Sequence, residues 1–198
     1  MLGSTTDSRY TKVAITLHWV IALSIICLII AGLVMSEDDL LPKALRFQTF
    51  QLHKSLGLTV LVLSCVRLAW RLTHTPPPLP PGMKAWEKFA ASATHWGFYG
   101  LMFALPLSGW ALVSTSSWGL PTIWFGLFEW PHLPILSTLE NKTEINDLAG
   151  ETHEVLAWIA IALICLHIGA ALKHHVINRD DVLTRMLPFL KPLSRKVP

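Results

Sequence analysis

Nine histidines are the residues of this 198-residue sequence whose type and placement could do chemistry. Five of them fall within or at the ends of long apolar blocks: His18, His53, His95, His153 and His167. An ionisable side chain inside a membrane-spanning segment is costly, so by default it marks a functional site. Imidazole is also the commonest side-chain ligand of metals. The first chemistry to consider is therefore metal ligation by histidines that project from apolar helices.

Four apolar blocks must position these histidines, and they cover residues 13–35, 52–72, 93–115 and 153–172. Each is long enough to cross the bilayer core, which takes about 20 helical residues. Hydrophobic residues make up 52% of the chain and charged residues 15%, whereas soluble domains carry about a quarter charged residues. This composition excludes a soluble enzyme, a nucleic-acid binder and a disordered scaffold. We predict an all-α membrane protein, a bundle of four transmembrane helices that forms one domain over residues 1–198.

Neither a signal peptide nor a disulfide framework fits the sequence. The first block is longer than the 7–15 apolar residues of a signal peptide, and no small-x-small cleavage site follows it. The three cysteines, Cys27, Cys65 and Cys165, all lie inside the blocks and form no C-x-x-C pair. We interpret them as small apolar packing residues.

The distribution of charge predicts that both termini are cytoplasmic. With the N-terminus inside, 12 of the 16 lysines and arginines lie on the inner side, where cytoplasmic loops retain them. Nine of the 13 acidic residues lie on the outer side. The net charge of +3 therefore reflects membrane topology and does not indicate nucleic-acid binding.

Depth along the blocks sorts four of the histidines into two pairs. His18 and His167 are each six residues from the lysine at the inner end of their block, which places both roughly 9 Å deep. His53 and His153 begin the second and fourth blocks from the outside. His153 and His167, 14 residues apart, share one helical face to within about 40°. We predict an inner pair, His18 with His167, and an outer pair, His53 with His153.

Two facing imidazoles from separate helices suit a six-coordinate haem, whose flat ring can lie between the helices of a bundle. Zinc fits less well, because a tetrahedral site needs four ligands and each level offers two. No Asp or Glu occurs in the interior of any block, which disfavours a proton relay. Two haems at opposite depths would conduct electrons across the membrane. A non-redox protein, such as a histidine-lined metal transporter or a pH-sensing anchor, stays open as the alternative.

Further residues lie close to these pairs. His95, near the inner end of the third block, could bond a haem propionate or a quinone, and a structural role is equally compatible. Arg67, on the same face as His53 and 14 residues further along, lies at the level of the inner pair. It could neutralise a propionate or mark the inner boundary of the membrane. Small residues, which let helices or a porphyrin approach closely, lie near the histidines at Gly57, Gly97 and Gly169.

Three connections join the blocks. The first, Ser36–Gln51, and the second, His74–Ser92, are predicted loops, and a run of prolines between residues 76 and 81 stiffens the second. The third, Ser116–Glu151, is the longest. Its tryptophans and phenylalanines among Gly and Pro are typical of chain that lies at the headgroup level.

Four stretches of the sequence resemble the bacterial cytochrome b561 family. The first runs from Tyr10 to Trp19, and the second begins with Leu-His-Lys-Ser-Leu-Gly at 52–57 and ends with Val-Arg-Leu-Ala-Trp-Arg at 66–71. The third begins with Thr-His at 94–95 and ends with Ala-Leu-Pro-Leu-Ser-Gly at 104–109. The fourth begins with Gly-Glu-Thr-His at 150–153 and ends with Arg-Asp-Asp at 179–181. The resemblance covers about residues 9–187, nearly the whole chain.

The resemblance implies a four-helix membrane cytochrome with two b-type haems, whose axial ligands match His18, His53, His153 and His167. It implies an oxidoreductase that moves single electrons between an outer-face donor and the membrane quinone pool, ubiquinone or a similar quinone. In one branch of the family that donor is superoxide. It also implies a quinone site near the inner haem that involves His174, with His95 as a further contact.

The same resemblance implies a multi-pass protein of the bacterial inner (cytoplasmic) membrane. Its partners would be membrane lipid, a quinone and an unidentified outer-face donor, with no nucleic acid. A haem-b membrane subunit that anchors a dehydrogenase or hydrogenase is a close variant. A second subunit that co-purifies with the protein would favour that variant.

Overall fold

The computed structural model describes residues 9–37, 39–187 and 189–191. Its four long helices are α1 (Lys12–Ser36), α2 (Lys43–Thr73), α3 (Ala85–Thr115) and α5 (Lys142–Lys173), and α5 continues into the π-helix η1 (His174–Asn178). Each long helix contains a window apolar enough to cross a membrane, with a mean hydropathy between 1.3 and 2.6. The prediction of an all-α protein with four membrane-spanning helices is confirmed.

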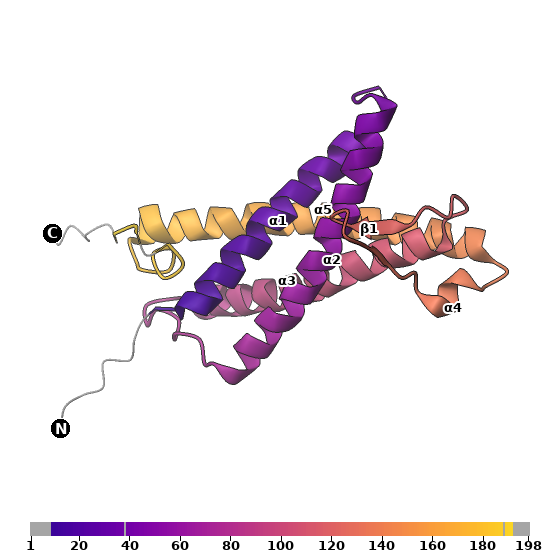
Figure 1. The fold of residues 1–198 in the computed structure, drawn as a ribbon. Coiled ribbons are helices and arrows are strands. Elements are labelled where there is room, and N and C mark those ends of the chain that lie inside the picture. The colour runs from indigo at the N-terminus through magenta and orange to yellow at the C-terminus, as the bar shows by residue number, and fades with distance from the viewer. Residues whose placement is uncertain (1–8, 38, 188, 192–198) are drawn as a thin grey trace.

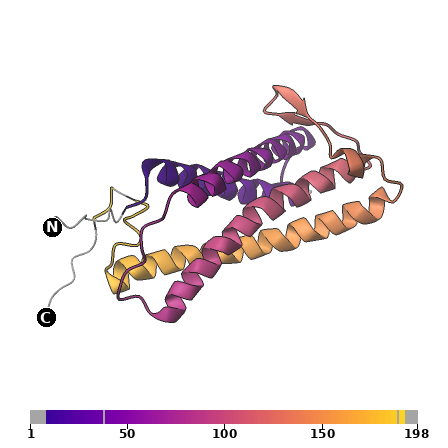
Figure 2. The same ribbon diagram turned by 90° about the horizontal axis from the view of Figure 1, so that it is seen from below.

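The four helices form two helical hairpins, α1 with α2 and α3 with α5, and α2 also packs against α3 (Figures 1 and 2). At one end of the bundle α1 and α3 begin and α2 and α5 end. We call it the basic end, because Lys12, Arg71, Lys84 and Lys173 lie there. The opposite end carries a small β-hairpin, and we call it the hairpin end. That the basic end faces the cytoplasm stays a prediction.

The helices extend further than the apolar blocks that predicted them. The first connection was expected over Ser36–Gln51, but α2 already begins at Lys43. The second and third connections are shortened in the same way, because α3 begins at Ala85 and α5 at Lys142. Hydropathy detects only the part of a helix that matches the hydrocarbon core, whereas a helix can continue into the headgroup region with polar residues. The expected loop boundaries were therefore wrong at these three helix starts.

The third connection contains secondary structure that the sequence did not predict. Strands β1 (Thr122–Trp124) and β2 (Phe128–Trp130) pair antiparallel, and the short helix α4 (Pro134–Ser137) follows them. The turn between the strands has positive φ at Phe125 (46°) and Gly126 (76°). Two positive φ values are typical of the type I′ turn that suits a twisted hairpin. Strands of three residues are too short to show a period in the sequence.

The hairpin is anchored on α2 by hydrogen bonds from residues that flank His53. The Oγ of Ser55, a residue only 1% exposed, accepts the backbone N–H of Phe125 at 3.1 Å and lies 3.1 Å from the carbonyl of Ile123. The Nζ of Lys54 donates to the carbonyl of Pro121 at 2.9 Å. These bonds offset the cost of the unusual φ at Phe125 and fix the hairpin against α2 at Lys54 and Ser55.

Replacing Ser55 with alanine should therefore loosen the hairpin. Loss of a buried hydroxyl that a backbone N–H needs is expected to reduce the free energy of unfolding by about 1–3 kcal/mol. Thermal denaturation in detergent and limited proteolysis of the 116–141 segment measure this effect. Ser64→Ala is the matched control, because Ser64 is equally buried but donates to Val60 within its own helix. Equal loss of stability in both variants would contradict the anchoring role.

The core of the bundle is small. Ile21, Val60 and Met102 form its buried centre, from α1, α2 and α3. Many large apolar side chains of the long helices instead point outwards, among them Leu23, Ile30, Val62, Val155 and Leu166. Outward-facing apolar residues are expected where lipid tails surround a bundle.

The chain after α5 returns across the basic end. The turn is made by Arg179, whose φ of 52° lies in the left-handed region. Beyond it, the Nη1 of Arg185 donates to the carbonyl of Pro78 at 2.5 Å. The carbonyl of Met186 accepts from the indole N–H of Trp19 at 2.8 Å. This return segment therefore joins α1 and the proline-rich connection at the same end of the molecule.

Candidate functional site

At the hairpin end, the imidazoles of His53 on α2 and His153 on α5 face each other. Their ring centroids are 6.2 Å apart, with an angle of 67° between the planes. Two imidazoles that ligate one metal ion from opposite sides, with metal–nitrogen bonds of about 2 Å, place their ring centroids about 6 Å apart. The structure thus brings the predicted outer pair together at a separation that fits a shared metal ion.

At the basic end, the imidazole of His167 on α5 lies beside two other histidines. Its ring centroid is 6.3 Å from that of His18 on α1, with an interplanar angle of 58°. It is 5.9 Å from that of His95 on α3. The edge of Phe98 closes a further side of the His167 ring, at 5.3 Å. The structure therefore brings the predicted inner pair, His18 and His167, close to each other. His95 is a further near neighbour of His167, which the count of residues along the helices did not predict.

Both histidine pairs join α5 to the α1–α2 hairpin. The close backbone packing of α5 is with α3, whereas no comparable backbone packing joins it to α1 or α2 among the described residues. The two pairs therefore connect the two helical hairpins, whose arrangement Figure 2 shows. Bundles hold flat macrocycles at such places, between facing helices.

The ring of His153 is oriented by α3. Its Nδ1 lies 3.0 Å from the carbonyl oxygen of Leu105 and 3.0 Å from the Oγ of Ser108. A carbonyl oxygen only accepts, so Nδ1–H of His153 is the donor. The lone pair of the neutral ring is then on Nε2, which is the arrangement that metal-ligating histidines adopt.

Glycines provide space next to the outer pair. A Cβ added to Gly109 would lie 3.2 Å from Cε1 of His153, and one added to Gly32 would lie 3.6 Å from Cε1 of His53. A Cβ at Gly57, one turn from His53, would have no heavy atom within 4 Å. Together with the buried Nδ1 of His53, which has no hydrogen-bond partner, this space fits a flat group beside the His53 ring.

The three glycines that the sequence analysis named differ in the space around their Cβ positions. Gly57 and Gly169 have open space at the Cβ position, whereas a Cβ at Gly97 would contact the side chain of Leu163 at 3.5 Å. Gly97 thus serves helix packing between α3 and α5. Sequence reasoning missed Gly32 as a neighbour of His53, because the two residues are on different helices and no local motif connects them.

Arg67 lies at the level of the inner pair, as predicted. Its Nη2 is 3.3 Å from Nδ1 of His18, and its Nη1 donates to the carbonyl of Ala14 at 3.3 Å. A guanidinium only donates, so Nδ1 of His18 is the acceptor in this contact. Ligation through Nε2 puts the proton on Nδ1, and Arg67 then needs another acceptor. An anion beside Arg67 would supply it.

His174 is buried at the basic end. It is 8% exposed, and its Nδ1 lies 2.6 Å from Oδ2 of Asp180. The left-handed turn at Arg179 brings that carboxylate back to the ring. An ionised carboxylate only accepts, so Nδ1–H of His174 donates to Asp180, which orients the ring.

The described part of the chain holds no group of three or more His, Cys, Asp or Glu side chains placed to bind a metal ion. Each level instead offers a facing pair. That donor set fits an iron ion whose other four ligands come from a porphyrin. It does not fit a tetrahedral site made of protein ligands alone.

Comparison with known proteins identifies relatives along nearly the whole chain. The profile described as prokaryotic cytochrome b561 matches residues 9–189. Two proteins of Escherichia coli strain K12 are similar: cytochrome b561 homolog 2 is 35% identical over 191 residues, covering 94% of this chain and 95% of that protein. Cytochrome b561 homolog 1 is 32% identical over 188 residues, covering 93% and 99%. A Yersinia pestis protein named probable superoxide oxidase CybB is 31% identical over 182 residues, covering 91% and 96%.

Proposed function

Because this chain belongs to the prokaryotic cytochrome b561 family, we propose that it transfers single electrons from a donor at its hairpin end to a quinone at its basic end. The family and the four spanning helices make it a multi-pass membrane protein that transfers electrons with haem b. The observation that carries the finer proposal is the presence of two facing histidine pairs, with ring separations of 6.2 and 6.3 Å. We also propose that residues 1–198 form a single membrane domain and that the protein lies in the bacterial inner membrane.

The four paired histidines have defined roles in this proposal. His53 and His153 would hold one haem b, and His18 and His167 would hold the other. Haem b supplies reversible one-electron redox chemistry when it is bound. The two levels are about 21 Å apart along α5, so together they cover most of a bilayer core of about 30 Å.

The other residues of the sites orient ligands and balance charge. Ser108 and Leu105 hold the ring of His153 in the tautomer that ligates through Nε2. Arg67 is placed to balance negative charge beside His18. We propose that His95 and His174 face the quinone, and that the His174–Asp180 pair holds a proton for it.

We propose superoxide as the donor, because one relative is named a probable superoxide oxidase. Each superoxide gives one electron and becomes dioxygen. A quinone takes two electrons and two protons to become a quinol. Two superoxide ions per quinone therefore balance the reaction, with the protons taken up at the basic end.

The test is a reduced-minus-oxidised spectrum of the purified protein with a pyridine haemochrome count, followed by stopped-flow measurement of superoxide decay with a short-chain ubiquinone. Two haems b per chain and quinone-dependent superoxide decay are expected. A folded but colourless protein would refute the cytochrome function. Two haems without quinone-dependent decay would refute the donor, and a stoichiometric second subunit would indicate the anchoring role.

Substitution of Ser108 by alanine tests the orientation of His153. The variant removes one partner of Nδ1 and leaves the carbonyl of Leu105 in place, so the outer haem should still bind. Its affinity is expected to fall about tenfold, as is typical when a hydrogen-bond partner of a metal-ligating histidine is removed. Haem titration of the apoprotein measures this. Ser114→Ala is the control, because Ser114 on the same helix bonds Trp110 and Leu133 rather than a histidine. The same loss in both variants would refute the role of Ser108.

A further inference from the structure

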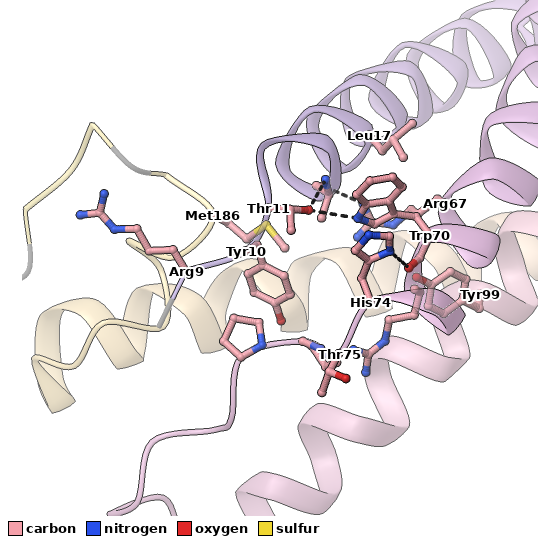
Figure 3. A pocket seen from close by; sticks show the side chains of 14 residues that line it. Arg9, Tyr10, Thr11, Leu17, Arg67, Trp70, His74, Thr75, Tyr99 and Met186 are labelled. Carbon is pink, nitrogen blue, oxygen red and sulfur yellow. Dashed lines mark hydrogen bonds between the residues drawn. The ribbon is translucent and has the colours of Figure 1, made fainter. Parts of the chain in front are cut away.

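A pocket opens at the basic end, where α1 begins and α2 ends (Figure 3). Its walls come from segments far apart in the sequence: the start of α1, the last two turns of α2, the proline-rich connection and the return segment after α5. The polar lining includes Tyr10, Arg67, Arg71, His74, Thr75 and Tyr99. Leu17, Pro76, Pro77 and Met186 supply the apolar part. None of the described residues that line it is Asp or Glu.

Among the described residues that line this pocket, no carboxylate balances the positive charge. Arg67 and Arg71 both line this pocket. Nη1 of Arg71 is buried and has no hydrogen-bond partner. A third arginine, Arg9, also lines the pocket, but Figure 3 shows its guanidinium directed away from Tyr10. A buried polar atom without a partner is costly, so an anion that accepts from Nη1 of Arg71 would stabilise this pocket.

Two other basic side chains at the same end are paired. Lys173 contacts Glu87 at 2.5 Å, and Arg185 contacts Asp181 at 2.9 Å. The described residues around Arg67 and Arg71 provide no equivalent ion pair. An anion from outside the polypeptide would supply this balance.

The position of the pocket indicates which anion is available. Trp70 forms its wall: the indole N–H donates to Oγ1 of Thr11 at 3.0 Å, and the ring stacks on His74 at 3.8 Å. Thr11 also caps α1, because its Oγ1 accepts the N–H of Ala14. The pocket thus lies where two spans leave the bilayer, at the level at which tryptophan and tyrosine gather. Phospholipid headgroups occupy that level.

We propose that this pocket binds the phosphate headgroup of an anionic phospholipid, with Arg71 and Arg67 as its principal ligands. Guanidinium groups bind phosphate oxygens in pairs, with charge-assisted hydrogen bonds. Basic pockets between membrane helices on the cytoplasmic side are sites where anionic headgroups bind. The apolar residues Leu17 and Met186 provide contacts for the acyl chains. This site is independent of which donor supplies electrons.

The lipid would also act on the inner histidine pair. An anion near the inner haem favours the oxidised form, which carries one more positive charge. One of two midpoint potentials should therefore be lower in anionic lipid than in zwitterionic lipid.

Native mass spectrometry of the detergent-purified holoprotein tests the site, with phosphatidylglycerol and phosphatidylcholine as probes. Wild type should retain phosphatidylglycerol preferentially. Arg71→Gln is expected to weaken that retention about tenfold or more, because it removes charged hydrogen bonds. Lys88→Gln is the matched control, since Lys88 is exposed on α3 at the same end and does not line the pocket. It should change retention less than twofold.

Arg71→Lys keeps the charge but not the paired donors, so it should lose part of the retention even if Arg71→Gln does not fold. Equal retention of both lipids by wild type would overturn the proposal. Displacement of phosphatidylglycerol by inorganic phosphate would overturn it in favour of a free-anion site. Loss of haem with unchanged lipid retention in Arg71→Gln would overturn it in favour of a haem propionate. Loss of superoxide oxidation alone would count against the proposed donor and not against this site.

Discussion

Replacing His18 with alanine is expected to reduce the haem content from two b-type haems per chain to one. His18 provides one of the two imidazoles at the basic end, with its ring 6.3 Å from that of His167. A haem that loses one of two protein ligands is held only by the remaining bond and by packing. The pyridine haemochrome count measures the loss, and a redox titration shows which of two midpoint potentials disappears.

His53→Ala should give the complementary result, with loss of the other haem and the other midpoint potential. Both single variants should retain the haem that the unchanged pair holds, because the two levels are about 21 Å apart along α5. Loss of the same haem in the two variants, or of both haems in each, would contradict two independent centres.

His95→Gln is the decisive comparison for the inner pair. The ring of His95 is 5.9 Å from that of His167, so distance alone does not separate it from His18 as a ligand. The family resemblance and the matched depth of His18 and His167 both assign the ligation to His18. We therefore expect His95→Gln to keep two haems. Loss of the inner haem in this variant, with retention in His18→Ala, would reassign the ligand.

The second large effect is expected for Gly109→Val. A Cβ at this position would lie 3.2 Å from Cε1 and 3.4 Å from Nδ1 of His153. Even alanine requires a small shift of the ring, and the two methyl groups of valine require more. The shift would break the hydrogen bond from Nδ1 to Leu105. We expect the affinity for the outer haem to fall at least about tenfold, while the inner haem stays bound.

Gly100→Val is the matched control for this substitution. Gly100 is on the same helix, and a Cβ there would meet no heavy atom within 4 Å. Both variants place a β-branched residue in α3, so they share any cost in helix propensity. Haem counting and optical spectra of the two proteins separate that shared cost from displacement of His153. Full outer-haem content in Gly109→Val would show that the space at Gly109 is not needed.

Interactions between segments distant in the sequence account for what the sequence missed. The β-hairpin depends on Ser55, which is about 70 residues before the Phe125 whose N–H it accepts. The anion pocket joins Tyr10, Arg71 and Met186. No local pattern marks such contacts, because each segment satisfies ordinary rules for loops, helix ends or membrane boundaries.

The sequence by itself determined the four spanning helices and the depth of each histidine. Both depend on a count of residues along a helix, since hydrophobic length is set by bilayer thickness and each residue advances about 1.5 Å. Only the tertiary structure decided which side chains meet at one depth. Helix rotation and packing placed His95 as close to His167 as His18 is, and brought Arg67 to Nδ1 of His18. The depth of a residue depends only on its position along its own helix. Which side chains face each other depends on how two helices are fixed relative to each other by their packed side chains.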